Sequence, residues 1–114
     1  MTGDRENIVV FVAESAPGVL VGFGEAALRR DYVNGCETSP VGFLEGVYVD
    51  AAHRRTGAAR AIVEAALRWA AAKGCSEFAS DADILNEDSH RMHLALGFEE
   101  TERVVFFRKT LGEN

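Results

Sequence analysis

The sequence predicts an α+β fold, with a mixed and mostly antiparallel sheet that is flanked by helices. Three apolar runs follow one another early in the chain, which is typical of antiparallel strands. A long segment with helical spacing and a fourth apolar run come next, and this order predicts a strand-helix-strand unit with parallel strands. A length of 114 residues with 47% hydrophobic residues fits one globular domain, residues 1–114.

Three strands are expected in the first half of the chain. The first covers residues 8–13 and the second covers residues 19–28, and the turn-forming residues 15–18 between them predict a hairpin. Residues 29–40 are polar and contain Asn-Gly and Ser-Pro pairs, so we expect a loop there. A third strand over residues 43–49 then completes an antiparallel meander.

The clearest helix signal spans residues 57–73. Apolar side chains such as Ile62, Ala66 and Trp69 recur at helical spacing, and charged residues follow one another at four-residue intervals on another face. Gly74 comes directly afterwards and can end the helix in a left-handed turn.

Two strands and one helix are expected in the remainder. Residues 77–82 predict a strand, and Asn86 can cap a second helix that Gly97 stops. Residues 104–109 predict a last strand. The expected order of elements is therefore β-β-β-α-β-α-β.

The charge balance restricts the partners. Lys and Arg number 12 against 18 Asp and Glu, which gives a formal net charge of -6. We do not expect nucleic acid as a partner, because a duplex is held mainly by cationic contacts to phosphate. The acidic balance favours a cationic small-molecule substrate, or it serves solubility alone, and charge does not choose between the two.

Cysteine usage and hydropathy favour the cytoplasm. The two cysteines, Cys36 and Cys75, have neither metal-site spacing nor the density of a disulfide scaffold, and a reducing compartment suits them. No apolar run approaches the roughly 20 residues of a membrane-spanning helix, and the first seven residues lack a signal-peptide pattern. We therefore expect a soluble, cytoplasmic protein with no membrane partner.

The segment before the long helix is the first candidate site. It contains Arg54 and Arg55, and the small residues Gly57, Ala58 and Ala59 allow backbone amides to approach a ligand closely. Unpaired amides and the positive end of the helix dipole suit a pyrophosphate. Taken alone, such a segment is more often a simple turn.

Arg54, Gly57 and Ala59 follow a strand that ends Val-Tyr-Val-Asp, an arrangement that resembles the (Q/R)-x-x-G-x-(G/A) acetyl-CoA signature of the GNAT superfamily of N-acetyltransferases. Asn86, followed by a helix that ends Leu-Ala-Leu-Gly-Phe, resembles the second cofactor element of that family. From about Val19 to Lys109 the chain is similar to bacterial aminoglycoside 6'-N-acetyltransferases, most specifically in four strings: residues 31–36, 43–46, 74–81 and 97–104.

The resemblance implies transfer of an acetyl group from acetyl-CoA to a primary amine, in first place the 6'-amine of an aminoglycoside antibiotic. The amine would attack directly in a ternary complex. Two alternatives stay open: an acetyltransferase for another small amine, such as a polyamine or a peptide, and a non-catalytic remnant that binds CoA or dimerises. A homodimer is also implied, since related enzymes are often dimers.

The resemblance implies an acceptor pocket lined by four residues: Tyr32, Glu45, Asp81 and Glu102. Three carboxylates suit a polycation, and because like charges resist ionising together, one of them can accept a proton. Asp81 and Glu45 are the candidate catalytic bases, with Asp81 first because it ends a strand. Glu45 lies in an apolar run, where an unpaired carboxylate is costly. Glu102 can instead be a surface charge and Tyr32 a loop anchor.

The resemblance also implies where acetyl-CoA binds. The thioester arm would lie against the backbone of Val47, Tyr48 and Val49, where an N–H is free for the acetyl oxygen. The pyrophosphate would meet the amides that open the long helix, those of Arg55, Thr56, Gly57, Ala58, Ala59 and Arg60. Asn86 is implied as a pantetheine contact, although an ordinary helix N-cap explains it equally well.

Two departures from the family pattern stand out. His93 lies where many members have a tyrosine that protonates the departing thiolate; imidazole can donate a proton near neutral pH, but the thiolate can also leave without an acid. His90 is close by, yet no third ligand for a metal is evident, and no metal is expected. Seven residues precede Ile8, where members normally have a strand and one or two helices that shape the acceptor site. Cofactor binding is therefore better supported than turnover.

Overall fold

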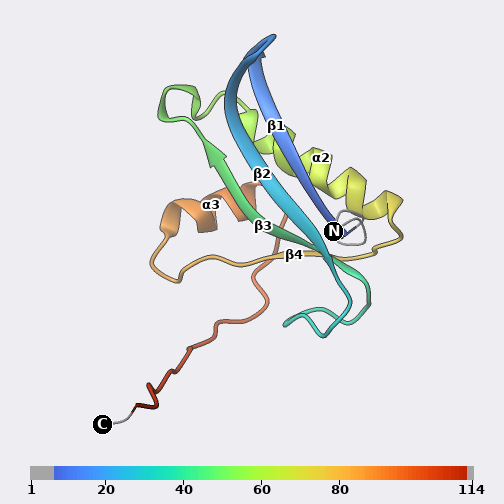
Figure 1. Ribbon diagram of the computed structural model, residues 1–114, viewed down its shortest axis with the longest axis vertical. Helices are drawn as coiled ribbons and strands as arrows, with labels where there is room; N and C mark the ends of the chain where they lie inside the picture. The colour runs from blue at the N-terminus through green and yellow to red at the C-terminus, as the bar shows by residue number, and fades with distance from the viewer. Residues whose placement is uncertain (1–6, 113–114) are drawn as a thin grey trace.

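The computed structural model describes residues 7–112; residues 1–6, which the signal-peptide argument concerned, lie outside this range. Four strands form one sheet in the order of the chain: β1 (Ile8–Ala16), β2 (Val19–Arg29), β3 (Val41–Val49) and β4 (Phe78–Ser80). The pairs β1–β2 and β2–β3 are antiparallel, and β3–β4 is parallel. The predicted mixed, mostly antiparallel sheet is thus confirmed (Figure 1).

The helices lie where the sequence predicts them. They are α2 (Ala58–Ala72), α3 (Glu87–Ala95) and a short 3-10 helix (Ala51–His53). Gly74 and Gly97 both have left-handed φ angles, 92° and 94°, just after α2 and α3, which confirms their role as helix ends. In the described part of the chain, no helix has the length and apolar character needed to cross a bilayer.

Helix α2 packs across one face of β1, β2 and β3 (Figure 1). Its buried side chains are Ile62, Val63, Ala66 and Ala70. Glycines in the sheet lie beneath them: a Cβ on Gly24 would come within 2.4 Å of Ile62 Cγ2, and a Cβ on Gly42 within 2.7 Å of Ala70 Cβ. The helix therefore lies deep on the sheet because these two positions have no side chain.

The loop between β2 and β3 covers the opposite face of the sheet. Because Gly42 faces α2, the alternation of a strand turns Val41 and Phe43 the other way. Both pack against Val33 from the loop, and the partly buried Cys36 joins them. The loop is consequently fixed to the sheet by a small core of its own.

The predicted last strand is wrong. Residues 104–109 form neither strand nor helix, and Figure 1 shows the C-terminal segment running away from the body of the protein. Its large apolar side chains are 47% to 91% exposed: Val104, Val105, Phe106, Phe107 and Leu111. The composition suits a strand, but a strand needs a neighbour for its backbone groups, and residues 7–112 supply none beside this segment.

Candidate functional site

Strands β3 and β4 pair over a short distance and then diverge. The ladder has three residue pairs and ends at Leu44 and Ser80, so β4 is shorter than the predicted strand over 77–82. β3 continues to Val49 and has no partner on this edge in the part of the chain described. An unpaired edge presents N–H and C=O groups that can bind a ligand. The backbone at residues 47–49, predicted to hold the thioester arm, lies on this edge.

The two predicted bases are the first residues after the ladder between β3 and β4 ends. Glu45 follows Leu44, and Asp81 follows Ser80, the last paired residues of the two strands. Paired strands lie about 4.8 Å apart, so the residues that precede the two carboxylates, Leu44 and Ser80, are neighbours across the ladder. Asp81 is exposed, and no side chain among residues 7–112 pairs with it.

Glu45 occupies a bulge and is held by a cation. The register passes from Glu25 opposite Gly46 to Ala26 opposite Leu44, which leaves Glu45 without a partner on β2. Its carboxylate accepts from Arg29 Nη2 at 2.8 Å and from Arg29 Nε at 3.2 Å. The carboxylate in the apolar run is therefore paired.

Arg29 is a site residue that the sequence analysis missed. Besides binding Glu45, its guanidinium lies 3.7 Å from the centre of the Phe43 ring, which holds it in a fixed orientation. Its position at the end of β2 is the only sequence signal, and the pairing depends on a bulge that the sequence pattern does not reveal.

The start of α2 presents free amides. Gly57, the N-cap, has φ 90° and Arg55 has φ 65°, so the chain turns sharply into the helix. The first helical hydrogen bond runs from Ala61 N to Gly57 O at 3.0 Å. The amides of Ala58, Ala59 and Arg60 precede that bond and have no acceptor within the described residues, which suits an anion.

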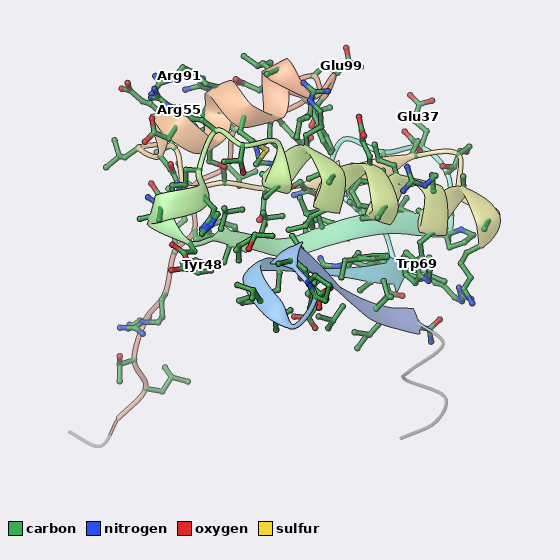
Figure 2. All side chains as sticks on the ribbon, turned by 90° about the horizontal axis from the view of Figure 1, so that it is seen from above. Glu37, Tyr48, Arg55, Trp69, Arg91 and Glu99 are labelled. Atoms are coloured by element: carbon green, nitrogen blue, oxygen red, sulfur yellow. The ribbon has the colours of Figure 1, made fainter. Side chains whose placement is uncertain are left out.

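The arginines around this turn differ in their bonding. Arg54 Nε donates to the carbonyl of Val49 at 3.1 Å, so it fixes the turn to the end of β3. Arg60 Nη1 lies 3.6 Å from Glu64, and its Nη2 donates to the carbonyl of Ala95 at 3.4 Å, which links α2 to α3. In Figure 2, Tyr48, Arg55 and Arg91 lie at the same end of the molecule.

Side chains predicted on the cofactor path occupy different faces. Val49 is buried, whereas Tyr48 is 52% exposed and contacts the ring of Phe23, with centroids 5.9 Å apart. The contact of the thioester arm with the backbone of residues 47–49 stays a prediction. Asn86 caps α3, since its Oδ1 accepts from Ser89 N at 3.1 Å; this is the N-cap role that the sequence left open.

The remaining predicted acceptor residues lie outside the strands and helices. Tyr32 is 77% exposed in the loop between β2 and β3, and Glu102 is exposed in the C-terminal segment. The two segments are in contact, because a Cβ on Gly35 would lie 2.3 Å from Thr101 Oγ1. Among the described residues, no hydrogen bond, ion pair or ring contact joins Tyr32 or Glu102 to Glu45 or Asp81.

Glu77 fastens the loop that contains Tyr32. Its carboxylate accepts from Thr38 Oγ1, from Thr38 N at 2.8 Å and from Glu37 N at 2.9 Å. The bonds from the Thr38 hydroxyl and then from the two backbone amides lower the pKa of Glu77 below its ordinary value. The sequence analysis placed this residue at the start of a strand and missed this function.

Two hollows flank the site without containing its carboxylates. One of about 470 Å³ lies between β1 and the start of α2, and Thr56, Gly57 and Ala58 line part of it. The other, about 300 Å³, lies between the loop and the end of α3, beside Cys36 and Phe98. Both cysteines are free, and no three metal-ligating side chains gather in the part of the chain described.

Comparison with known proteins gives a consistent result. Residues 2–98 match the Acetyltransferase (GNAT) family. The chain is 59% identical over 102 residues to an aminoglycoside N(6')-acetyltransferase type 1 from Serratia marcescens, covering 90% of this chain and 70% of that protein. It is 50% identical over 104 residues to the protein of that name from Salmonella typhimurium, covering 91% and 71%.

Solved structures agree. A structure of AAC(6')-Iy in complex with the bisubstrate analogue CoA-S-monomethyl-acetylneamine has a TM-score of 0.87 and 50% identity, over 92% of this chain and 71% of that one. A second structure of AAC(6')-Iy, in complex with CoA, has a TM-score of 0.86 and covers 78% of that chain. The fold of this chain is therefore similar to that of proteins that bind CoA.

Glu77→Gln tests how the loop is fastened. Because the folded-state pKa is lowered, ionised Glu77 stabilises the fold above its ordinary pKa, and this stabilisation is lost as the pH falls through the folded-state pKa. We expect E77Q to melt at a lower temperature than the wild type at pH values above the ordinary pKa of a glutamate, and the difference to disappear as the pH falls through the lowered pKa of Glu77.

Thermal unfolding followed by circular dichroism across this range measures the effect. Glu100, whose pKa Arg103 also lowers, is present in both proteins and cancels. Glu99→Gln is the control, because it removes an exposed carboxylate with no partner among residues 7–112. A melting difference for E77Q that does not change with pH would contradict this account of Glu77.

Proposed function

The chain belongs to the GNAT family of acetyltransferases, and we propose that it moves an acetyl group from acetyl-CoA to the 6'-amine of an aminoglycoside. The observation that supports this most directly is the divergence of β3 from β4 at Leu44 and Ser80. At that point an unpaired strand edge, the open amides of α2 and two carboxylate residues lie in one region. A thioester, a diphosphate and a cationic amine each need one of these groups.

Acetyl-CoA is the proposed cosubstrate, and the helix start suits its diphosphate. The amides of Ala58, Ala59 and Arg60 offer hydrogen-bond donors at the positive end of α2. The edge of β3 at residues 47–49 offers a backbone N–H to the acetyl oxygen, which would stabilise the negative charge that develops there during attack. Arg55 supplies a nearby positive charge.

Asp81 is the proposed base, ahead of Glu45. The acceptor arrives as an ammonium and must lose a proton before its nitrogen can attack the thioester carbon. Asp81 has no cation partner among the described residues, whereas Arg29 occupies the carboxylate of Glu45. The ammonium releases its first proton to solvent water; the new C–N bond then forms as the C–S bond breaks, Asp81 takes the second proton from the nitrogen, and coenzyme A leaves as the thiolate.

The acceptor would be held by negative charge. The formal net charge of -6 attracts a polycation, and the residues proposed to contact it are Glu45, Asp81, Glu102 and Tyr32. Glu45 would contribute its charge from its place beside Arg29. We place the reaction in the cytoplasm, because the free cysteines suit a reducing compartment.

We further propose that the protein works as a homodimer. The C-terminal segment exposes Phe106 by 89% and Phe107 by 91%, and two adjacent aromatic side chains are seldom left in water without a partner. A second copy that covers residues 104–107 of each chain would bury them. Glu102 lies just before this segment, so the assembly would also order one proposed acceptor residue.

An acceptor panel tests the function. We expect coenzyme A release, followed with a thiol reagent, with kanamycin-type aminoglycosides that have a free 6'-amine and none with analogues that lack it, because only that amine is presented to the thioester. Spermidine and a lysine-containing peptide are the controls for a broader amine acetyltransferase. Release with these controls but not with the aminoglycosides would overturn the proposed acceptor.

Asp81→Asn tests the base. We expect turnover to fall on the order of 100-fold, because the amide keeps the shape but cannot accept the proton. Calorimetry should show unchanged acetyl-CoA binding. The matched control is Asp88→Asn, which changes an exposed carboxylate on α3 that pairs with Arg91. An unchanged rate in D81N would remove Asp81 from this role.

Phe107→Asp tests the dimer. Sedimentation should show a dimer for the wild type and a monomer for the variant, because a charge at this position cannot be buried against a second copy. Val19→Asp, at a 49% exposed position on β2, is the control and should stay dimeric. A wild-type monomer at all concentrations tested would rule the proposal out.

A further inference from the structure

We propose that His93 is a positioning residue, which in one fixed tautomer holds the carboxyl end of β4 to α3 and thereby fixes the backbone from which Asp81 projects. The importance of Asp81 rests on the proposed function. The attachment itself concerns only residues of this chain, and it can be tested without any substrate.

Both ring nitrogens of His93 have partners. Nδ1 lies 2.7 Å from the carbonyl oxygen of Ser89, one turn earlier in α3, and Nε2 lies 2.8 Å from Ser80 Oγ. A carbonyl oxygen can only accept, so the hydrogen of the neutral ring is on Nδ1. Nε2 is then an acceptor, and the hydroxyl of Ser80 donates to it. This pattern selects one tautomer.

The ring is also held by packing. It meets the ring of Phe98 edge to face, with centroids 5.2 Å apart, and Phe98 in turn lies 6.1 Å from Phe78 of β4. The amide of Phe98 donates to the carbonyl of His93 at 3.0 Å. The imidazole is therefore fixed from two sides, between the end of α3 and β4.

The strand end needs such a support. β4 has three residues, and its ladder with β3 stops at Ser80. Asp81 comes next and has no partner of its own among residues 7–112. The hydrogen bond from Ser80 to His93 is thus the last attachment before the proposed base, and a shift of the strand end would move that carboxylate away from the amine.

A direct proton donor would use His93 differently. To protonate a departing thiolate, the ring would need Nε2 to carry a hydrogen that points at sulfur, but in the neutral ring Nε2 accepts from Ser80. A positioning residue needs only an acceptor at that place. A glutamine carbonyl can accept the hydroxyl of Ser80 and cannot donate a proton at neutral pH, so His93→Gln separates the two roles.

Kinetics of three variants, H93F, H93Q and S80A, test the proposal. We expect kcat to fall about 10-fold in H93F and S80A, because a displaced base loses alignment, with acetyl-CoA affinity unchanged in calorimetry. H93Q should keep kcat within about twofold of the wild type, since it restores the hydrogen bond. The double variant S80A/H93F should be no slower than either single variant, because both remove the same bond.

Two results would overturn the proposal. If H93Q is as slow as H93F while S80A keeps full activity, His93 is a proton donor and not a positioning residue. If all three variants keep wild-type kcat, the attachment has no role in the reaction. S80A leaves the ring in place, so the test holds even if H93F does not fold.

Nuclear magnetic resonance distinguishes failure of this proposal from failure of the proposed function. Nitrogen shifts of the imidazole should show hydrogen on Nδ1, and amide exchange at Ser80 and Asp81 should be faster in H93F than in H93Q or the wild type. If the wild type acetylates no aminoglycoside, the function is wrong and these measurements still decide the attachment. Hydrogen on Nε2, or unchanged exchange in H93F, would refute it.

Discussion

The brevity of the β3–β4 ladder is the constraint on which the rest of the site depends. A longer ladder would fill the edge of β3 with strand hydrogen bonds and would leave no backbone group there for a ligand. Because pairing stops at Leu44 and Ser80, backbone groups and acidic side chains become available in the same place. The bulge at Glu45 lies directly after the last pair of this ladder, and it changes the face of the sheet to which the following residues of β3 point.

Three different attachments keep this open region in shape. Arg54 binds the end of β3 and so fixes the turn before α2, Glu77 binds the loop above β3, and His93 binds the end of β4. All three are hydrogen bonds and not ion pairs. Each is a hydrogen bond to a segment end, where the regular ladder of the sheet can no longer hold the chain.

Local signals explain what the sequence could predict. Helix α2 has regular apolar spacing and Asn86 a capping position, so their bounds could be read from neighbours in sequence. The ion pair of Glu45 with Arg29 joins residues 16 apart and depends on a bulge, and Glu77 binds residues about forty positions earlier. The prediction of a strand at 104–109 was wrong for a related reason. The composition of the segment favours a strand, but a strand also needs a partner from elsewhere in the chain, and the composition does not reveal whether one is present.

The two glycines under α2 determine how far the helix lies from the sheet, and this distance matters for the cofactor site. The helix start and the edge of β3 come from different layers, and one diphosphate-containing molecule is proposed to touch both. The distance between the helix layer and the sheet depends on the missing side chains of Gly24 and Gly42. A methyl group at either position would push α2 away from the sheet. Residues distant from any ligand thus determine whether a ligand of fixed length can span both layers.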